Sequence, residues 1–301
     1  MSSVRLIRLL AIVGALLPAL PLPALTIASY NVENYLVTDR MVDGVYRQAY
    51  PKPEPEKTAV RRVIGGIAPD IVALAEMGQP PFLEELQRDL RREGQDYPHG
   101  VVLEAADADR HVALLAKVPV KEIKRHTDVK FTFLGQPDVV KRGVLEVVFA
   151  TDQGDLSVFV IHLKSKRTER PDDPLGAAQR LGEAEAVRDL ILSRFPDPTK
   201  ALYVVCGDWN DARNSKSTRA LQKRGDTVVG EILRAADSRG EVWTHFYRAE
   251  DSYSRIDFLM VSPALKPFVE GGRGAVYDGP ASTEGSDHRA VYARFKLEPA
   301  R

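Results

Sequence analysis

Cysteine and net charge are the two things that this 301-residue chain has least of. It contains one cysteine, Cys206, and its 42 basic side chains are balanced by 42 acidic ones. A single thiol excludes an internal disulfide framework and a cysteine-rich zinc site. A balanced charge means that any nucleic-acid binding would need a local basic surface. Cys206 ends an apolar run, so we expect a buried thiol without a partner.

Internal repeats and low-complexity linkers are absent as well. The 21 glycines and 20 prolines belong to an ordinary globular composition, which excludes collagen-like, disordered and coiled-coil classes. The length suits one large domain or two small ones. Because no linker separates two halves, we expect one domain over residues 25–301.

The N-terminal residues 1–24 have the pattern of a secretory signal peptide. Arg5 and Arg8 form a short positive region, and an apolar stretch follows that three prolines interrupt. A transmembrane helix needs ~20 apolar residues without such breaks. We therefore expect cleavage near Ala24 and export to the periplasm or the exterior. The alternatives are an uncleaved membrane anchor and a buried first helix.

Short apolar runs alternate with amphipathic segments along the rest of the chain. Two sheets with helices outside them fit this order. A purely parallel, doubly wound sheet fits less well, because the middle has too many consecutive strands. Strands are predicted at Leu25–Tyr30, Asp70–Ala75, Pro98–Leu103, His111–Ala116, Val120–Arg125, Val139–Ala150, Leu156–Leu163, Leu202–Cys206, Ile256–Val261 and Ala290–Phe295, and helices at Lys57–Ile67, Pro81–Arg92 and Gly176–Arg194.

Two further segments are predicted to lie at the surface. Val37–Glu56 is a polar stretch with three prolines, and we interpret it as a long loop, which is typical of a lid or a mobile segment. The longest helix carries polar side chains that we interpret as surface charge. They are Gln179, Arg180, Glu183 and Glu185.

Polar side chains stand where the predicted strands end, which is where an α/β scaffold presents a site. Any one of them is typical of a turn or a helix cap. Asp257 is harder to explain as a turn or cap residue, because burying a carboxylate in an apolar strand costs several kcal/mol unless it is paired. The argument depends on the joint pattern: Asn31, Glu33, Glu76, His162, Asp208, Asn210, Asp211, Asp257, Asp287 and His288.

Six segments carrying these residues occur in an order that resembles the endonuclease/exonuclease/phosphatase superfamily. The G-D-x-N and S-D-H elements together are specific. The resemblance implies an α+β fold of the DNase I-like type, a four-layer α/β/β/α sandwich of two mixed, mostly antiparallel sheets packed face to face. The segments are SYNVEN (Ser29–Asn34), PDIVALAEM (Pro69–Met77), FVIHLKSKR (Phe159–Arg167), CGDWND (Cys206–Asp211), SRIDFLMVS (Ser254–Ser262) and SDHRAVYA (Ser286–Ala293).

The same resemblance implies a site for a divalent cation, Mg²⁺ or Mn²⁺. Glu76 matches the principal metal ligand of the family, Asn31 and Glu33 match residues beside that metal, and Asp287 matches a further acidic group. Carboxylate oxygens are the ligands that a hard cation prefers.

Catalytic roles are implied for five other positions. Asp208 matches the residue that orients or deprotonates the attacking water, and Asn210 matches its positioning partner. His288 matches the histidine that contacts the scissile phosphate, and Asp257 matches the carboxylate that fixes its ring. His162 matches a histidine that helps to neutralise the phosphoryl oxygens. Repair-type members carry a tyrosine there, so His162 favours the phosphatase and secreted-nuclease side of the family.

Basic and aromatic side chains near these motifs are candidates for substrate binding. Arg142, Lys164 and Lys166 would attract a polyanion, although a solvated charged face has the same composition. Tyr253 could stack on a base or sugar, whereas Trp209 is expected to pack beneath its motif. The expected partner is a phosphoester, favoured to be nucleic acid, with a monomeric protein that has no stable protein partner. Membrane contact is expected only if the N-terminal segment stays uncleaved.

The function predicted is an exported, metal-dependent phosphodiesterase, foremost a nuclease. The alternative is a phosphatase or a phospholipid or sphingolipid phosphodiesterase on the same fold. An apolar hairpin near the site would favour lipid, and we identify no clear one in the sequence. A non-catalytic binding module is disfavoured because all the catalytic residue types are present. The chain lacks the G-x-S-x-G element of serine hydrolases and the G-N-H-E element of calcineurin-like phosphatases.

Overall fold

The computed structural model of the chain describes residues 24–300. The signal peptide predicted for residues 1–24 therefore lies outside the described residues but for Ala24. Among the residues that are described, no helix is both long and apolar enough to cross a membrane.

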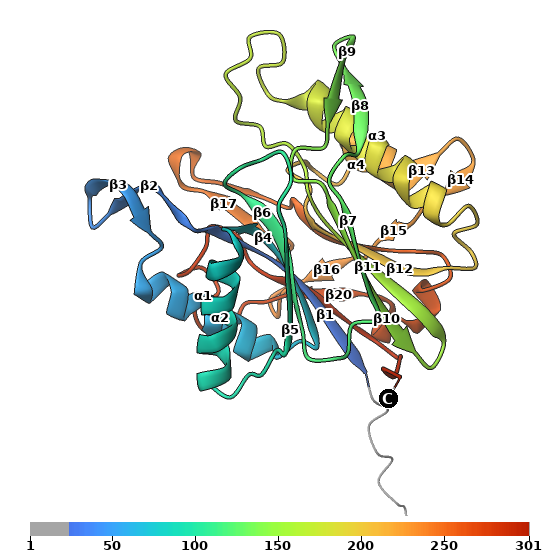
Figure 1. The fold of residues 1–301 in the computed structure, drawn as a ribbon, viewed down its shortest axis with the longest axis horizontal. Coiled ribbons are helices and arrows are strands. Elements are labelled where there is room, and N and C mark those ends of the chain that lie inside the picture. The colour runs from blue at the N-terminus through green and yellow to red at the C-terminus, as the bar shows by residue number, and fades with distance from the viewer. Residues whose placement is uncertain (1–23, 301) are drawn as a thin grey trace, which may run out of the picture.

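One of the two sheets has seven strands and contains the N-terminal strand near its centre (Figure 1). β1 (Leu25–Tyr35) pairs in parallel with β4 (Ile71–Met77) and antiparallel with β21 (Val291–Phe295). β4 in turn pairs antiparallel with β6. The strand order of this seven-stranded sheet is β16 (Ala235–Ala236), β20 (Gly274–Val276), β21 (Val291–Phe295), β1 (Leu25–Tyr35), β4 (Ile71–Met77), β6 (His111–Ala116) and β5 (His99–Leu103).

The other sheet has six strands and is also mixed. β11 and β12 are parallel neighbours, while β10 and β19 pair antiparallel with them on either side. Its order is β15 (Glu231–Ile232), β19 (Asp257–Val261), β12 (Leu202–Asp208), β11 (Gly154–His162), β10 (Val144–Thr151) and β7 (Glu122–His126).

Three apolar clusters stack these elements into four layers. The central cluster joins side chains of both sheets, such as Ile27 and Leu114 from one and Val158 from the other. A second cluster packs α1 (Glu54–Ile67) and α2 (Pro80–Arg92) on the outer face of the seven-stranded sheet. A third packs α3 (Ala177–Arg194) and α4 (Lys216–Gln222) on the outer face of the other. The predicted α/β/β/α sandwich is confirmed (Figure 1).

Two hairpins, two short ladders and three single-turn helices complete the described chain. The β2–β3 hairpin projects from the left of Figure 1, and the β8–β9 hairpin projects from the top. The pairs are β2 (Val37–Val42) with β3 (Val45–Pro51), β8 (Lys130–Phe133) with β9 (Gln136–Val139), β13 (Lys223–Arg224) with β14 (Thr227–Val228) and β17 (His245–Tyr247) with β18 (Ser252–Ser254), and the helices are η1 (Arg248–Glu250), η2 (Lys266–Phe268) and η3 (Glu270–Gly272).

The prediction of a long loop over Val37–Glu56 is wrong, because most of that segment is the β2–β3 hairpin. Asp43 and Gly44 form its turn with φ of 52° and 75°. Two successive residues with positive φ match the twist of paired strands, and Asp-Gly is the dipeptide that adopts them most readily. The prolines do not disturb the pairing, because Pro51 ends β3 and α1 follows.

Two other sequence-based expectations differ from the structure. Val139–Ala150 is not one strand, because a turn at 141–143 with Gly143 at φ 63° separates β9 from β10. Gln179, Arg180 and Glu183 of α3 are buried rather than surface charge, and only Glu185 is exposed. The polar partners of Arg180 and Glu183 come from distant loops, which the sequence pattern does not show.

The burial of Arg180 and Glu183 ties together the loops that lead to the strand ends. The Glu183 carboxylate accepts the backbone N–H of Lys164 at 2.7 Å, and that of Lys141 at 3.4 Å. Arg180 donates to Asp211 at 3.1 Å and to the carbonyl of Lys164 at 2.9 Å. Through these hydrogen bonds, the two buried side chains hold the segments that follow β11 and β12 at fixed positions beside α3.

A buried ion pair holds the segment that precedes β21. Arg289 donates to Asp237 at 2.8 Å, with side-chain exposures of 1% and 0%. Its guanidinium also donates to the carbonyl of Trp243 and stacks on the Trp243 ring at 3.5 Å. Burial would raise the pKa of Asp237, but hydrogen bonds from Arg289 and two backbone N–H groups lower it to about 2.

We expect the Arg289→Met substitution to lower the free energy of unfolding by ~3–5 kcal/mol, because it leaves the Asp237 carboxylate buried without its partner. Urea unfolding at pH 7 measures the change. Arg294→Met is the matched control, since Arg294 is exposed on the same stretch of chain, and its effect should stay within ~0.5 kcal/mol. A loss below ~1 kcal/mol in Arg289→Met would show that the pair is not an anchor.

Candidate active site

The polar residues singled out in the sequence meet at one edge of the sandwich. β11 and β12 run in parallel and bring His162 level with Asp208, and the antiparallel β19 brings Asp257 level with Asp208 on the other side. The facing sheet contributes the ends of β1 and β4 and the segment just before β21. Three neighbouring strands of one sheet thus face three segments of the other.

Bulges at the ends of β1 and β4 turn the acidic side chains toward this edge. The register of the β1–β4 pair shifts between Asn31 and Tyr35. Glu33, Asn34 and Glu76 have φ of 45°, 53° and 61°. Residues other than glycine rarely adopt this left-handed backbone conformation, and those that are held in it cluster at functional sites. A bulge re-aims a side chain that the regular pleat would point elsewhere.

The Asn31 amide joins the two sheets across the site. Its Nδ2 donates to Glu76 Oε1 at 3.3 Å and to Asp208 Oδ2 at 3.1 Å, and lies 3.4 Å from His288 Nε2. Its Oδ1 accepts the backbone N–H of Glu33 at 2.9 Å, which fixes the orientation of the amide. One buried side chain therefore contacts the principal metal-ligand candidate, Glu76, and two of the five catalytic candidates, Asp208 and His288.

Asp257 and His288 form a second link between the sheets. The His288 Nδ1–H donates to Asp257 Oδ2 at 2.8 Å, because a carboxylate can only accept. Burial would lower the pKa of His288, but the Asp257 and Asp208 carboxylates outweigh it and raise the pKa well above its ordinary value. The Nε2 atom lies 3.8 Å from Asp208 Oδ2. This pairing explains the carboxylate in an apolar strand.

Asp208 and Asn210 are oriented by contacts within their own motif. The backbone N–H of Asn210 donates to Asp208 Oδ1 at 2.8 Å, and its Nδ2 donates to Asp208 Oδ2 at 3.2 Å and to the carbonyl of Leu163 at 3.0 Å. Burial, reinforced by the charge of Asp257, raises the pKa of Asp208 to about 7. A carboxylate with such a pKa can exchange a proton near neutral pH. Trp209 is fully buried against Phe258, as expected.

His162 lies on the opposite side of Asp208 from Asp257. Its Nε2 is 3.6 Å from Asp208 Oδ2, and its side chain is 2% exposed. Burial, with the nearby charge of Arg142, lowers the pKa of His162 well below its ordinary value. The ring is therefore neutral at pH 7 and can donate one N–H to a bound anion.

Glu33, Asp287 and Glu76 are three carboxylates at the mouth of the site. The backbone N–H of Asp287 donates to Glu33 Oε2 at 2.9 Å, and Asn34 N–H donates to Glu76 Oε2 at 3.0 Å. Burial and the charge of Asp287 raise the pKa of Glu33 to about 7. Within residues 24–300 the buried Oδ1 of Asn34 has no hydrogen-bond partner. Crowded carboxylates beside a free amide oxygen fit a hard divalent cation.

The four candidates for substrate binding do not all reach this cluster. Arg142 is near it, since its Nη1 donates at 3.4 Å to the Leu163 carbonyl that also accepts from Asn210, and its Nε donates to Asp107 at 2.7 Å. The Lys164 ammonium is turned to loop carbonyls, including that of Ser165 at 3.2 Å.

The other two candidates lie further from the cluster. Lys166 is exposed on the loop after β11. The Tyr253 ring stacks on Phe246 at 4.6 Å. Tyr253 pairs with Phe246 across β17 and β18, so both point to the hairpin face opposite His245. The structure therefore places Tyr253 away from the catalytic cluster.

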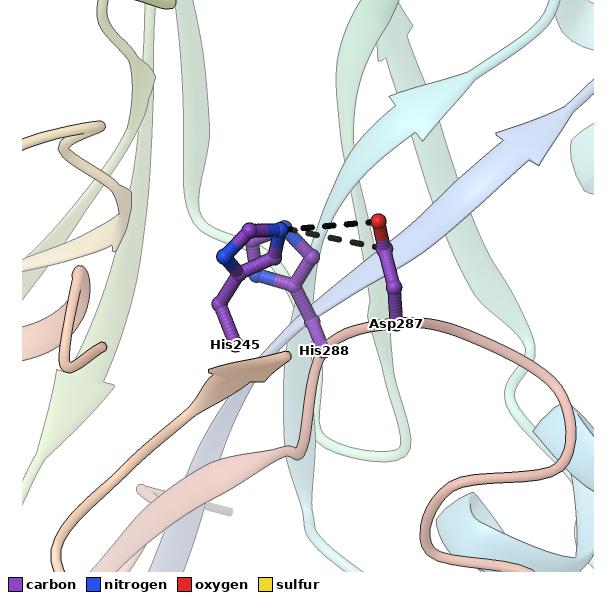
Figure 2. A group of neighbouring side chains, drawn as sticks. All are labelled: His245, Asp287 and His288. Atoms are coloured by element: carbon purple, nitrogen blue, oxygen red, sulfur yellow. Dashed lines mark ion pairs between the residues drawn. The ribbon is translucent and has the colours of Figure 1, made fainter. Parts of the chain in front are cut away.

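Sequence reasoning missed His245 of β17 as a site residue. Its Nε2 lies 3.5 Å from Asp287 Oδ2, and its ring centroid is 4.6 Å from that of His288 (Figure 2). The strand has only three residues and is surrounded by irregular chain, so no periodicity pointed to it. Ser286 lies in the S-D-H element, but sequence reasoning gave it no role. Its hydroxyl donates to the Asn31 carbonyl at 2.8 Å, a tertiary contact that the sequence does not show.

The two-sheet sandwich and its cluster of acids, amides and histidines define a hydrolase that acts on phosphoester bonds. The chain belongs to the endonuclease/exonuclease/phosphatase family, whose sequence profile matches residues 28–288. A search among curated proteins finds no match.

Solved structures with low sequence identity share the fold. Sphingomyelinase C from Streptomyces griseocarneus is 15% identical with a TM-score of 0.61, over 91% of this chain and 99% of that one. The human Nocturnin catalytic domain with bound sulfate is 16% identical with a TM-score of 0.60, over 91% and 95%. A beta toxin mutant from Staphylococcus aureus with bound magnesium ions is 14% identical with a TM-score of 0.61, over 90% and 99%.

We expect Asp208→Asn to stabilise the metal-free protein at pH 8. The folded pKa of Asp208 lies above its unfolded value, so folding favours the protonated acid. Stability from this group is present below about pH 4 and is lost as the pH rises through about 7. Removing the buried charge should therefore raise the unfolding free energy by ~1 kcal/mol or more, although it also removes the contact with His288.

Urea unfolding in EDTA at pH 5 and pH 8 measures this effect. Asp226→Asn is the control, because Asp226 is fully exposed and should show no change. A stability of Asp208→Asn that is equal to or below that of the native chain at pH 8 would contradict the buried-charge argument.

Proposed function

We propose that the chain is an exported, metal-dependent phosphodiesterase that cleaves nucleic acid by in-line attack of a water molecule on phosphorus. The observation that carries this proposal is the joint burial of Asp208, the Asp257–His288 pair and the Asn31–Glu76 contact at one edge of the sandwich. A base, a cationic hydrogen-bond donor and a cation site then lie within reach of one phosphate group.

The cation, Mg²⁺ or Mn²⁺, would be held by Glu76 with Asn31, Glu33 and Asp287 beside it. When bound, it supplies positive charge that polarises the phosphoryl oxygens. Support comes from the crowding of these carboxylates and from the magnesium ions bound to the beta toxin of similar fold.

The protein's own residues divide the remaining work. Asp208 accepts the proton of the attacking water, and the two hydrogen bonds from Asn210 hold its carboxylate in position. His288, whose ring is held in position by Asp257, donates from Nε2 to a phosphoryl oxygen, where charge grows in the transition state. The neutral His162 donates to the same phosphate from the other side of Asp208.

Nucleic acid is proposed as the substrate because basic side chains border this edge. Arg142 lies beside the catalytic motif, and the exposed Lys166 stands on a separate loop, the one that follows β11. Local cations of this kind attract a polyanion without a net positive charge. Export is the part of the proposal that depends on residues 1–24, and N-terminal sequencing of protein recovered outside the cytoplasm tests it.

We expect the purified protein to hydrolyse bis(p-nitrophenyl) phosphate and DNA with Mg²⁺ or Mn²⁺ and to stop in EDTA. Asp208→Asn should lower kcat by ~10²–10⁴-fold, because the general base is lost, and His288→Ala by ~10²–10³-fold, because a transition-state donor is lost. His99→Ala is the control, as His99 lies at the opposite end of the seven-stranded sheet. Full activity in either catalytic variant would refute the mechanism.

A second candidate substrate, a phospholipid or sphingolipid, is favoured by the β2–β3 hairpin. The sequence showed no clear apolar hairpin near the site, and this expectation is overturned by the exposed apolar side chains of that hairpin. Met41 and Tyr46 are 61% and 58% exposed, and Val37, Val45 and Tyr50 are also exposed. Clustered apolar groups on a surface are typical of membrane or partner contact.

The hairpin is attached directly to the site. β2 begins two residues after β1 ends, and the Arg40 guanidinium donates to the carbonyls of Asn34 and Leu36 at 2.9 Å. Lys52, which follows β3, donates from its buried ammonium to the carbonyl of Glu33 at 2.8 Å. A lipid held by this hairpin would therefore present its phosphate close to the proposed cation site.

We expect a double substitution, Met41→Ser with Tyr46→Ser, to separate the two substrates. If the substrate is lipid, hydrolysis of sphingomyelin or phosphatidylcholine vesicles should fall ~10-fold or more, while bis(p-nitrophenyl) phosphate hydrolysis stays unchanged. Leu134→Ser is the control, since Leu134 is 51% exposed at the tip of the other projecting hairpin. DNA cleavage without vesicle hydrolysis in the native chain would exclude the lipid candidate.

A further inference from the structure

Five arginines outside the catalytic cluster follow one another around one flank of the sandwich. β15 and β16 are edge strands of the six-stranded and the seven-stranded sheet, and the chain passes from β15 to β16 through residues 233–234 (Figure 1). The arginines line this crossing and continue from it in both directions. We call them the arginine track: Arg213, Arg255, Arg234, Arg273 and Arg294.

Two of the five begin the track beside the catalytic motifs. Arg213 lies on the loop that follows β12, and Arg255 lies two residues before Asp257. Arg213 Nη2 donates to the carbonyl of Ile232 at 3.0 Å. Arg255 Nη2 donates to the carbonyl of Leu233, the next residue, at 2.8 Å. The two guanidinium groups are therefore held side by side at the end of β15.

The other three arginines lie level with one another on neighbouring strands of the seven-stranded sheet. Ala235 of β16 pairs with Gly274 of β20. A Cβ atom at Gly274 would lie 3.6 Å from that of Ala235 and 3.7 Å from that of Ala293 in β21. Ala235 and Ala293 face the central apolar cluster. Because side chains alternate along a strand, the residues next to these three positions point to the outer face of the sheet. They are Arg234, Arg273 and Arg294.

The track lacks negative charge of its own. Four of its arginines are exposed, and Arg255 is half-buried. Within residues 24–300, none of the five has a carboxylate oxygen within 4.0 Å, because the acids nearest in the chain are paired elsewhere. The buried Asp237 pairs with Arg289. Glu231 pairs with Lys266. Like charges on neighbouring strands destabilise a sheet, so an arginine row without acids fits a surface that binds an anion.

Arg255 has unused capacity to bind an anion. Its Nε is buried and has no hydrogen-bond partner in the described part of the chain. Burial, with the nearby charge of Arg213, lowers the pKa of Arg255 to about 10. Its guanidinium lies 5.4 Å from the centre of the Phe258 ring, which limits its movement. A phosphate oxygen at this point would supply both an acceptor and an opposite charge.

We propose that the arginine track binds the sugar-phosphate backbone of a single-stranded nucleic acid that leaves the active site beside Asp257. The proposal rests on the proposed function and deepens it, because it names the form of the nucleic acid. The shape of the track favours a single strand. It turns from the edge of one sheet to the outer face of the other, and packed sheets lie ~10 Å apart.

This turn disfavours the other large anions. A flat membrane surface cannot touch both ends of a track that bends around a flank. Duplex DNA is stiff, with a persistence length of ~150 base pairs, so a bend over so short a distance is costly. The track is roughly 20 Å long by strand rise and strand spacing. At ~3.4 Å per stacked nucleotide, this corresponds to ~6 nucleotides.

Binding measured without turnover tests the proposal. Fluorescein-labelled single strands of ~24 and ~4 nucleotides are titrated in EDTA at several salt concentrations and followed by fluorescence anisotropy. The variant is Arg273→Gln with Arg294→Gln. The control is Arg92→Gln with Arg125→Gln, which removes the same charge from two exposed arginines on α2 and β7, by the opposite edges of the sheets. Circular dichroism confirms that each is folded.

We expect the Arg273→Gln/Arg294→Gln variant to bind the long strand ~10-fold more weakly or worse at ~0.1 M salt, because two phosphate contacts are lost. The slope of log K against log salt should fall by ~1.4, at ~0.7 per contact for single strands. The control should match the native chain. The short strand, which occupies too little of the track, should bind equally to all three proteins.

Three results would overturn the proposal. The first is an unchanged affinity for the long strand in the folded Arg273→Gln/Arg294→Gln variant, or an equal loss in the control. The second holds even if that variant misfolds: the native chain binds the long strand no more tightly than the short one. The third is binding to phosphatidylglycerol vesicles that the variant loses while its strand binding is unchanged, which would assign the track to a membrane.

Hydrolysis of the long strand by the native chain with Mn²⁺ is measured separately. Binding that depends on Arg273 and Arg294 without hydrolysis would defeat the proposed function and leave the track standing. Hydrolysis with equal binding by the native chain and the variant would do the reverse. The two ideas therefore fail by different results.

Discussion

The active site depends on the packing of one sheet against the other. Asp257 belongs to the six-stranded sheet and His288 to the segment that leads into the seven-stranded one, and their 2.8 Å contact crosses the interface. The Asn31 amide crosses it again to reach Asp208. Neither sheet holds all of the candidate catalytic groups, so the central apolar cluster between the sheets sets the distances between them.

Burial at this interface also sets the protonation of the site. Asp208 and His288 are both almost fully enclosed, and in such surroundings a charge is tolerated only beside an opposite charge. The carboxylate of Asp257 therefore keeps His288 protonated, while Asp208 shares that one cation and has a raised pKa. A divalent cation near Glu33 and Asp287 would relieve the remaining crowding of acids, which gives the site a physical reason to bind metal.

Most of the fold could be predicted, because strands that are buried on both faces have sequences that are continuous apolar runs. Asp70–Ala75 corresponds closely to β4, and its final position leads directly to Glu76. The β2–β3 hairpin was not predicted, since the residues of β2 alternate between exposed and half-buried, those of β3 are all exposed, and neither strand has an apolar run. Only Asp43-Gly44 marks its turn. Strands of two or three residues, such as β17, are too short for any periodicity.

The candidate site was predictable where a side chain follows a strong strand, as Asp208 and His162 do. It was not predictable where tertiary contacts decide. Tyr253 is an aromatic residue near a motif, yet strand pairing turns it to the far face of its hairpin. The sequence pattern placed Glu183 on the surface, yet its carboxylate is buried, because it accepts hydrogen bonds from two loop N–H groups. His245 acquires meaning only from a bridge to a residue 43 positions later.

The anchoring of the β2–β3 hairpin has a consequence for how this chain can diverge. Arg40 and Lys52 bind carbonyls of the bulge at its base, whereas the Asp43-Gly44 turn at its tip has no such attachment to the site. Insertions and new side chains at the tip would leave the bulge geometry untouched, while changes at the base would disturb Glu33 and Asn34. The hairpin thus separates a tip that can change freely from a base that is tied to the site, within fifteen residues of chain (Val37–Pro51).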